Sequence, residues 1–206
     1  VVVKGAKQKV IDAVDCTGNT CVVENIVATF TLKFPGKTGV HVYVKVTDNV
    51  AGTAAGGDVE NRTYQNNSTT MVLLKNTYDV VVKIGADSFI LDDINCTGNT
   101  CTYSLAVVKL VNSANVALAG GVVKYYDGSW HPVGNTNASG LMAFGFPGTS
   151  TNLLFSVDYA FTHNEKWQNI ATNPIVLFQT KKVEVQLKNS GGAFVDAGVP
   201  AGVVNL

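Results

Sequence analysis

The residues best suited to do chemistry are the four cysteines, all of which lie in two copies of one hexapeptide, CTGNTC. One copy runs from Cys16 to Cys21 and the other from Cys96 to Cys101. Gly and Asn tolerate a positive φ, so the residues between the cysteines predict a tight hairpin turn. Cysteines that face each other at the base of a hairpin lie close enough to form a disulfide. We therefore expect the disulfides Cys16–Cys21 and Cys96–Cys101.

Other uses of the cysteines stay open at this point. Four cysteines allow three pairings, among which the sequence does not choose. An all-cysteine zinc site usually has its ligands in tighter knuckles, and the C-x4-C spacing is at the edge of that range. Reduced thiols are the third alternative. Disulfides form in oxidising compartments, so the expected pairing indicates an extracellular protein.

No other residues form a catalytic motif. The chain has three histidines, of which His163 follows Asp158 and Ser156 closely, but no G-x-S-x-G sequence accompanies them. The zinc-protease, P-loop and dinucleotide-binding motifs do not occur. Asp92, Asp93 and Asn95 carry oxygen ligands, but calcium needs about six of them. We expect a protein that is not an enzyme and that holds no cofactor and no metal.

The composition also excludes two kinds of partner. The chain has 15 basic and 15 acidic residues and a charged fraction of only 15%, so its net charge attracts neither nucleic acid nor an anionic membrane. Arg62 is the one arginine, although arginine is favoured for binding phosphate. The apolar runs are too short to span a bilayer. The chain begins with Val1, which indicates a mature chain whose signal peptide has been removed, or a trimmed one.

The elements that must position these residues are β-strands. Val, Thr, Tyr and Gly are abundant, which favours strands and turns over helices. Runs such as VHVYVKV at residues 40–46 alternate between apolar and polar side chains, as half-buried strands do. Many short strands separated by turns predict an all-β fold of antiparallel Ig-like or Greek-key β-sandwiches.

The chain contains long repeats. The sequence VVVKGAKQKVIDAVDCTGNTC opens the chain, and VVVKIGADSFILDDINCTGNTC starts at Val80. A second echo relates VVKLVNSANVALAGGV, from Val107, to VEVQLKNSGGAFVDAGV, from Val183. Repeats of this length indicate tandem small domains. We predict two tandem sandwich modules, at residues 1–79 and 80–180, and an extra terminal strand segment at residues 181–206.

Five Asn residues fit the N-glycosylation pattern N-x-Ser/Thr and are candidate sites for covalent glycans. An Asn- and Thr-rich chain also produces such triplets by chance. The candidates are Asn61, Asn66, Asn67, Asn95 and Asn137.

A family resemblance begins at Val107. The sequence VVKLVNSANVALAGGVVKYYDGSW and the later NTNASGLMAFGFPG are similar to repeats of prokaryotic surface proteins with prealbumin-like or Cna-B-like β-sandwiches. The resemblance implies a module of a stalk, an adhesin or an extracellular fibre. Some relatives carry Lys–Asn isopeptide bonds, for which Lys109 or Lys124, Asn169 and the acid Asp158 are the matching residue types.

The segment 181–206 suggests a function. An unpaired apolar strand must be covered or paired, and one solution inserts it into a neighbouring subunit, which propagates a filament. We predict a structural subunit of an extracellular filament whose partner is a second copy of itself. Val183, Val185 and Leu187 are the candidate donor-strand residues, and Val1 and Val3 are their N-terminal alternative.

The second hypothesis is a monomeric cell-surface adhesin or carbohydrate-binding stalk module. Aromatic rings cluster in KYYDGSWHP, where an exposed ring on a turn could stack on a sugar. The aromatic candidates are Tyr125, Tyr126, Trp130 and His131. Such rings also commonly support the core or the tip of a hairpin.

Overall fold

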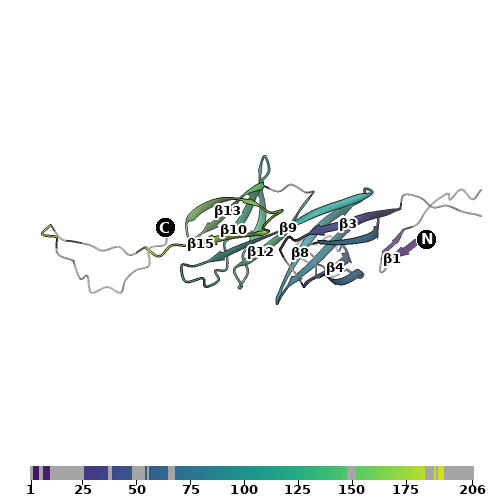
Figure 1. The fold of residues 1–206 in the computed structure, drawn as a ribbon, viewed down its shortest axis with the longest axis horizontal. Coiled ribbons are helices and arrows are strands. Elements are labelled where there is room, and N and C mark those ends of the chain that lie inside the picture. The colour runs from purple at the N-terminus through teal and green to yellow at the C-terminus, as the bar shows by residue number, and fades with distance from the viewer. Residues whose placement is uncertain are drawn as a thin grey trace, which may run out of the picture. The chain divides into compact units, whose positions relative to one another are not determined.

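The computed structural model describes residues 2–4, 7–9, 26–36, 39–47, 54, 56–64, 68–147, 152–183, 188 and 190–192. These residues form strands and turns and contain no helix (Figure 1). In the same residues, therefore, no helix is long and apolar enough to cross a membrane. The strands are β1 (Val2–Lys4), β2 (Lys7–Lys9), β3 (Val27–Lys33), β4 (Val40–Val46), β5 (Asp58–Tyr64), β6 (Ser68–Leu74), β7 (Asn76–Ile84), β8 (Asp87–Cys96), β9 (Thr100–Val111), β10 (Val122–Tyr126), β11 (Trp130–Asn135), β12 (Leu141–Pro147), β13 (Asn152–Tyr159), β14 (Thr162–Asn169) and β15 (Ile175–Gln179).

The strands form where apolar side chains alternate. In β3, Phe30 and Leu32 are fully buried while the neighbouring Thr29 is exposed. In β4, Val42 and Val44 are fully buried in the same way. Successive side chains of a strand point to opposite faces of the sheet, so this alternation gives β3 and β4 one core face each. The all-β sandwich fold that the sequence predicts is confirmed.

The chain divides into two compact units, each made of several segments. Unit 1 comprises Val1–Val107, Ala143–Leu153 and Gln168–Ile175. Unit 2 comprises Val108–Met142 and Leu154–Trp167, with Val176–Leu206 as its last segment. The unit boundaries fall inside strands: β9 passes from unit 1 to unit 2 at Val107.

Each unit is a sandwich with the same strand order. In unit 1, the sheet β5-β4-β7-β8 faces strands in the order β6-β3-β9. The second sandwich has the sheet β11-β10-β13-β14 and strands β12, β9 and β15, with β9 paired to both others; residues 143–147 of β12 belong to unit 1. Strands β3 to β9 therefore correspond in order to strands β9 to β15. β9 has two roles: it is the last strand of the first sandwich and the first strand of the second.

Both antiparallel and parallel strand pairs occur in the first sandwich. β3 pairs antiparallel with β6, and β4 pairs antiparallel with both β5 and β7. β3 and β9 run parallel, with Phe30 opposite Cys101 and Leu32 opposite Tyr103. The sheet is therefore mixed, and the prediction of purely antiparallel modules is corrected in this detail. Parallel pairing needs a long crossover, which β4 to β8 provide.

The sequence repeats do not begin and end at the same residues as the sandwiches. The second copy of the repeat begins at Val80, which lies inside β7 rather than between two units. Its first part forms the β7–β8 hairpin, which pairs with β4 and completes the first sandwich. The predicted boundary between residues 79 and 80 thus falls within a strand of unit 1.

The first copy of the repeat also begins with a hairpin. β1 and β2 pair antiparallel, with Lys4 opposite Lys7. In β7–β8, Ile84 is opposite Asp87 across the turn Gly85–Ala86. In the described part of the chain, β1 and β2 form a two-stranded sheet of their own. They repeat the local structure of β7–β8 but not its pairing with a further strand.

Candidate functional site

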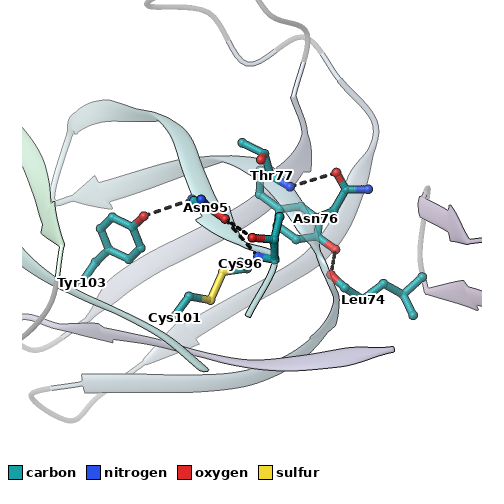
Figure 2. Close-up of a disulfide and its surroundings, with 9 residues drawn as sticks. Leu74, Asn76, Thr77, Asn95, Cys96, Cys101 and Tyr103 are labelled. Carbon is teal, nitrogen blue, oxygen red and sulfur yellow. Dashed lines mark hydrogen bonds between the residues drawn. A yellow bond between two sulfur atoms is a disulfide. The ribbon is translucent and has the colours of Figure 1, made fainter. Parts of the chain in front are cut away.

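A disulfide joins Cys96 at the end of β8 to Cys101 in β9, with a Cα–Cα distance of 5.1 Å (Figure 2). This pairing is the one that the second hexapeptide's spacing predicts. The turn, however, is not the predicted hairpin, because β8 pairs with β7 while β9 pairs with β3 in the other sheet. Both cysteines are buried. The disulfide therefore links the two sheets of the first sandwich. Cys16 and Cys21 lie outside the described residues.

Polar contacts hold the turn around this disulfide. Asn95 accepts hydrogen bonds through Oδ1 from the backbone N–H and the hydroxyl of Thr97, at 3.0 and 2.7 Å (Figure 2). The Asn95 backbone N–H donates to the Tyr103 hydroxyl at 3.0 Å. Below it, the buried Tyr78 hydroxyl donates to the Leu74 carbonyl at 2.5 Å, and burial raises the pKa of Tyr78 to about 12. The hydrogen bonds of Asn95 thereby hold the start of the turn.

A groove with an apolar floor opens on unit 2, with a cavity volume of about 320 Å³. Its floor consists of Leu110, Val157 and Phe178, which come from both sheets of the second sandwich and are all buried. Among the described residues, β14 is the end strand of its sheet. The groove therefore lies where the two sheets of the sandwich leave an opening.

The segment after β15 starts at this groove. The Thr180 N–H donates to the Val111 carbonyl at 3.0 Å, which continues the contact of β15 with β9. Lys181 and Val183 line the groove. Val183 is thus the one candidate donor residue that the structure describes; Val185 and Leu187 lie outside the described residues. The first residues of the segment contact their own sandwich.

The N-terminal alternative is described only in part. Val3 lies in β1 opposite Gln8 of β2. Val1 lies outside the described residues. A strand that is already paired on one side can still accept a further strand on its other side.

The aromatic cluster lies on the β10–β11 hairpin. Tyr125 stacks on His131 with ring centroids 4.9 Å apart, and Tyr126 meets Trp130 at 5.4 Å with the rings tilted by 60°. These are the cross-strand neighbours of the register. The His131 imidazole also contacts the Asp127 carboxylate at 2.7 Å. The rings contact one another across the hairpin, while Tyr126 and Trp130 stay 37% and 40% exposed.

A charged cluster crosses the same sheet. Lys124 of β10 donates to Asp158 of β13 at 3.0 Å, and the His163 ring of β14 contacts Asp158 through Nδ1 and Glu165 through Nε2. The hydrogen bonds from His163 and Lys124 lower the pKa of Asp158. The hydrogen bonds to Glu165 and Asp158 raise the pKa of His163. The cluster contains two basic and two acidic groups.

These contacts leave Lys124 in a different role from the one the resemblance implies. It forms an ion pair with Asp158 whose side chains are 38% and 36% exposed, rather than an isopeptide bond. Lys109 is exposed. The Asn169 side-chain oxygen accepts the N–H of Ala171 at 3.0 Å. The sequence does not give these partners, because strand register brings together residues far apart in the chain.

The described glycosylation candidates lie at exposed positions. Asn61, Asn95 and Asn137 are exposed, whereas Asn66 and Asn67 lie outside the described residues. The Asn61 side-chain oxygen contacts His41 Nε2 at 2.6 Å, and that of Asn137 accepts two backbone N–H groups. Their exposure is what attachment of a glycan requires. Glycosylation itself stays a prediction.

The sequence offers Asp92, Asp93 and Asn95 as oxygen ligands for calcium beside the second hexapeptide. Asp93 accepts from the Thr47 hydroxyl at 3.5 Å, and its N–H donates to Asp79 at 3.4 Å. In the part of the chain that the structure describes, no group of three or more His, Cys, Asp or Glu side chains is arranged to hold a metal ion.

No protein-family model matches this chain. No curated protein matches it either. Among solved structures, the chain is similar to the TIE protein of Bacillus anthracis, at 14% identity and a TM-score of 0.29 over 76% of this chain and 34% of that one. It is also similar to a streptococcal ancillary pilin, at 13% identity and a TM-score of 0.25 over 86% of this chain and 73% of that one. The chain thus spans about a third of the length of the first.

Proposed function

We propose that this protein is the structural subunit of an extracellular filament, in which copies join head to tail by β-strand complementation. The observation that carries the proposal is the double role of β9, which ends one sandwich and begins the next. Within one chain, modules are therefore joined by a shared strand. The same kind of joint between two chains would generate a polymer.

The C-terminal segment supports this reading. Residues 183–199 repeat the sequence from Val107 onward, which includes the end of β9 and the connection to β10. The segment follows β15, the strand that corresponds to β9 in the second sandwich. By this correspondence, the segment has the sequence of a strand that would open a third sandwich. Its apolar face would consist of Val183, Val185 and Leu187.

The N-terminal segment supplies complementary elements. β1–β2 repeats the β7–β8 hairpin, and each hairpin is followed by CTGNTC and then by β3 or β9. In the first sandwich, β7–β8 completes a sheet by pairing with β4. By sequence, residues 1–25 thus resemble the hairpin that closes a sandwich, and residues 183–199 resemble the strand that opens one. We infer that the C-terminal segment of one copy and the N-terminal segment of another build one composite sandwich.

The energetics favour such a contact. A strand added to a sheet gains backbone hydrogen bonds along its length, and alternate side chains fill apolar pockets. Each added strand also removes an exposed edge, which would otherwise invite uncontrolled pairing. Disulfides within the modules, such as Cys96–Cys101, suit a filament outside the cell because they form in oxidising compartments.

Two truncated chains test the proposal. We expect that a chain lacking residues 181–206 and a chain lacking residues 1–9 each stay monomeric, as measured by light scattering after size-exclusion chromatography and by negative-stain microscopy. Mixed together, they should form a one-to-one dimer that grows no further, because one intact donor meets one intact acceptor. The full-length chain should form filaments.

The matched control keeps the length of the C-terminal segment and changes its apolar face. A full-length chain with Val183→Ser, Val185→Ser and Leu187→Ser should not polymerise, while Glu184→Ser and Gln186→Ser should polymerise like wild type. Filaments from the chain that lacks residues 181–206 would contradict the proposal. Filaments from the chain that lacks residues 1–9 would limit it to the C-terminal segment alone.

A further inference from the structure

The outer face of the sheet β11-β10-β13-β14 carries a pocket of about 310 Å³ that the filament proposal does not use. The residues that line it are Lys124, Trp130, Pro132, Ser156 and His163. They come from all four strands of the sheet. Figure 1 shows β10 and β13, the two central strands, next to each other.

Ser156 forms the floor of this pocket and is unusual. It lies between the core residues Phe155 and Val157, so its side chain points to the opposite face of the sheet. It is fully buried, and its hydroxyl oxygen makes no hydrogen bond within the part of the chain that the structure describes. A buried hydroxyl without a partner costs free energy, because its desolvation is not compensated by a hydrogen bond. Because this oxygen has almost no accessible surface, a ligand group reaches it only when a covering side chain moves aside, and it would then remove this cost.

The pocket is lined partly by apolar and partly by polar side chains. Trp130 and Pro132 supply apolar surfaces, and the Trp130 ring is 40% exposed. Lys124 and His163 supply polar groups, each held in place by Asp158. Pockets for small molecules combine apolar walls with a few fixed polar groups in this way, and about 300 Å³ is the lower end of their usual size.

Charge indicates which ligands fit. Lys124 and protonated His163 are balanced by Asp158 and Glu165, which contact them directly. Neither carboxylate lines the pocket, but each offsets the charge of a basic group that does, so the pocket offers no unbalanced charge to an anion or a cation. The ligand that these walls favour is neutral, has an apolar face for the Trp130 ring, and carries hydroxyl groups for Ser156 and the charged rim. A pyranose ring has these properties.

We propose that the pocket formed by Lys124, Trp130, Pro132, Ser156 and His163 binds one neutral sugar residue of a glycan, with the sugar's apolar face on Trp130 and a sugar hydroxyl hydrogen-bonded to Ser156. This site shares Trp130 with the aromatic cluster on the β10–β11 hairpin. It differs from that cluster because its specificity comes from β13 and β14. Sugar binding at this pocket does not depend on filament formation.

Saturation-transfer NMR and calorimetry on the full-length protein test the site with methyl glucoside, methyl galactoside, methyl mannoside and N-acetylglucosamine. At least one of these sugars should bind saturably. Trp130→Ala should abolish this binding, and Ser156→Ala should weaken it about tenfold. Trp167→Ala is the matched control, because Trp167 is an exposed tryptophan of β14, 59% exposed, that does not line the pocket. It should leave the affinity unchanged.

Thermal unfolding separates binding from a structural role of Ser156. Because Ser156→Ala removes an unpaired buried hydroxyl, the variant should unfold at the wild-type temperature or above it while losing affinity. The proposal is overturned if none of the four sugars binds, if Trp167→Ala and not Trp130→Ala removes binding, or if inorganic phosphate binds in their place.

Discussion

At the scale of single residues, His163 has the clearest electrostatic role, since its two ring nitrogens contact two carboxylates. These contacts raise the pKa of His163, with the hydrogen bond to Glu165 as the largest cause. The neighbouring Asp158 has a lowered pKa, mainly through its hydrogen bond with His163. Between the ordinary pKa of Asp and that of His, the contact of Asp158 with His163 is therefore an ion pair.

The sign of these shifts predicts how stability depends on pH. A raised histidine pKa contributes stability that is fully present below about pH 6.5 and is lost as pH rises through the folded pKa. The lowered Asp158 pKa contributes stability that is present above about pH 3.9 and is lost as pH falls through the folded value. We expect urea denaturation to show that His163→Gln destabilises the protein at about pH 5 and has little effect at about pH 8.

The control for this experiment is His41→Gln, because His41 is a partly exposed histidine that contacts the neutral Asn61 side chain. An equal effect of His163→Gln at both pH values would contradict the assignment. The effect should be small in either case, because the side chain of His163 is 51% exposed and solvent screens its ion pairs.

Gly140 shows a second residue-scale requirement, close packing of the backbone. Its φ is +70°, and a Cβ at this position would collide with the carbonyl oxygen of Leu110. Gly36 also has a φ of +70° but has open space where a Cβ would be. Denaturant titration should show that Gly36→Ala costs about 1 kcal/mol from the backbone conformation alone, and Gly140→Ala at least about 3 kcal/mol. Equal costs would mean that the Gly140 turn adapts.

At the scale of elements, the Cys96–Cys101 disulfide connects β8 and β9 of two different sheets. In a chain with Cys16→Ala and Cys21→Ala, adding Cys96→Ala and Cys101→Ala should lower the free energy of unfolding by about 2 kcal/mol, because the loop is short. A reductant should cause a similar loss in the parent chain and none in the variant. No loss on reduction would show that packing alone holds the two sheets together.

The sequence predicts many elements but not their partners. The alternation in VHVYVKV predicts the strand that the structure has as β4, at the same residues. The hexapeptide predicts the Cys96–Cys101 pairing but suggests a hairpin, because the local turn chemistry is the same whether the next strand returns to the same sheet or enters the other one. The contact of Lys124 with Asp158 depends on the register of β10 and β13, which no local pattern contains.

At the scale of the whole molecule, the sequence repeats begin at other residues than the sandwiches do, and this difference predicts which fragments fold. A fragment of residues 1–79 ends inside β7 and lacks β8 and β9, so β4 loses one neighbour and β3 loses its parallel partner. We expect this fragment to show no cooperative thermal transition by circular dichroism. Residues 1–111 contain every strand from β1 to β9 and should unfold cooperatively. A cooperative transition in the shorter fragment would contradict the shared role of β9.

The amino-acid sequence by itself determined that the protein is built of strands and that it contains long repeats, and it favoured the pairing of Cys96 with Cys101 without choosing it. These properties depend on side-chain periodicity and on short loops, which act locally along the chain. Only the tertiary structure decided that β9 belongs to two sandwiches and that Ser156, Trp130 and His163 line one pocket. Such facts follow from which strands pair and in what register, and long-range hydrogen bonds and core packing decide both.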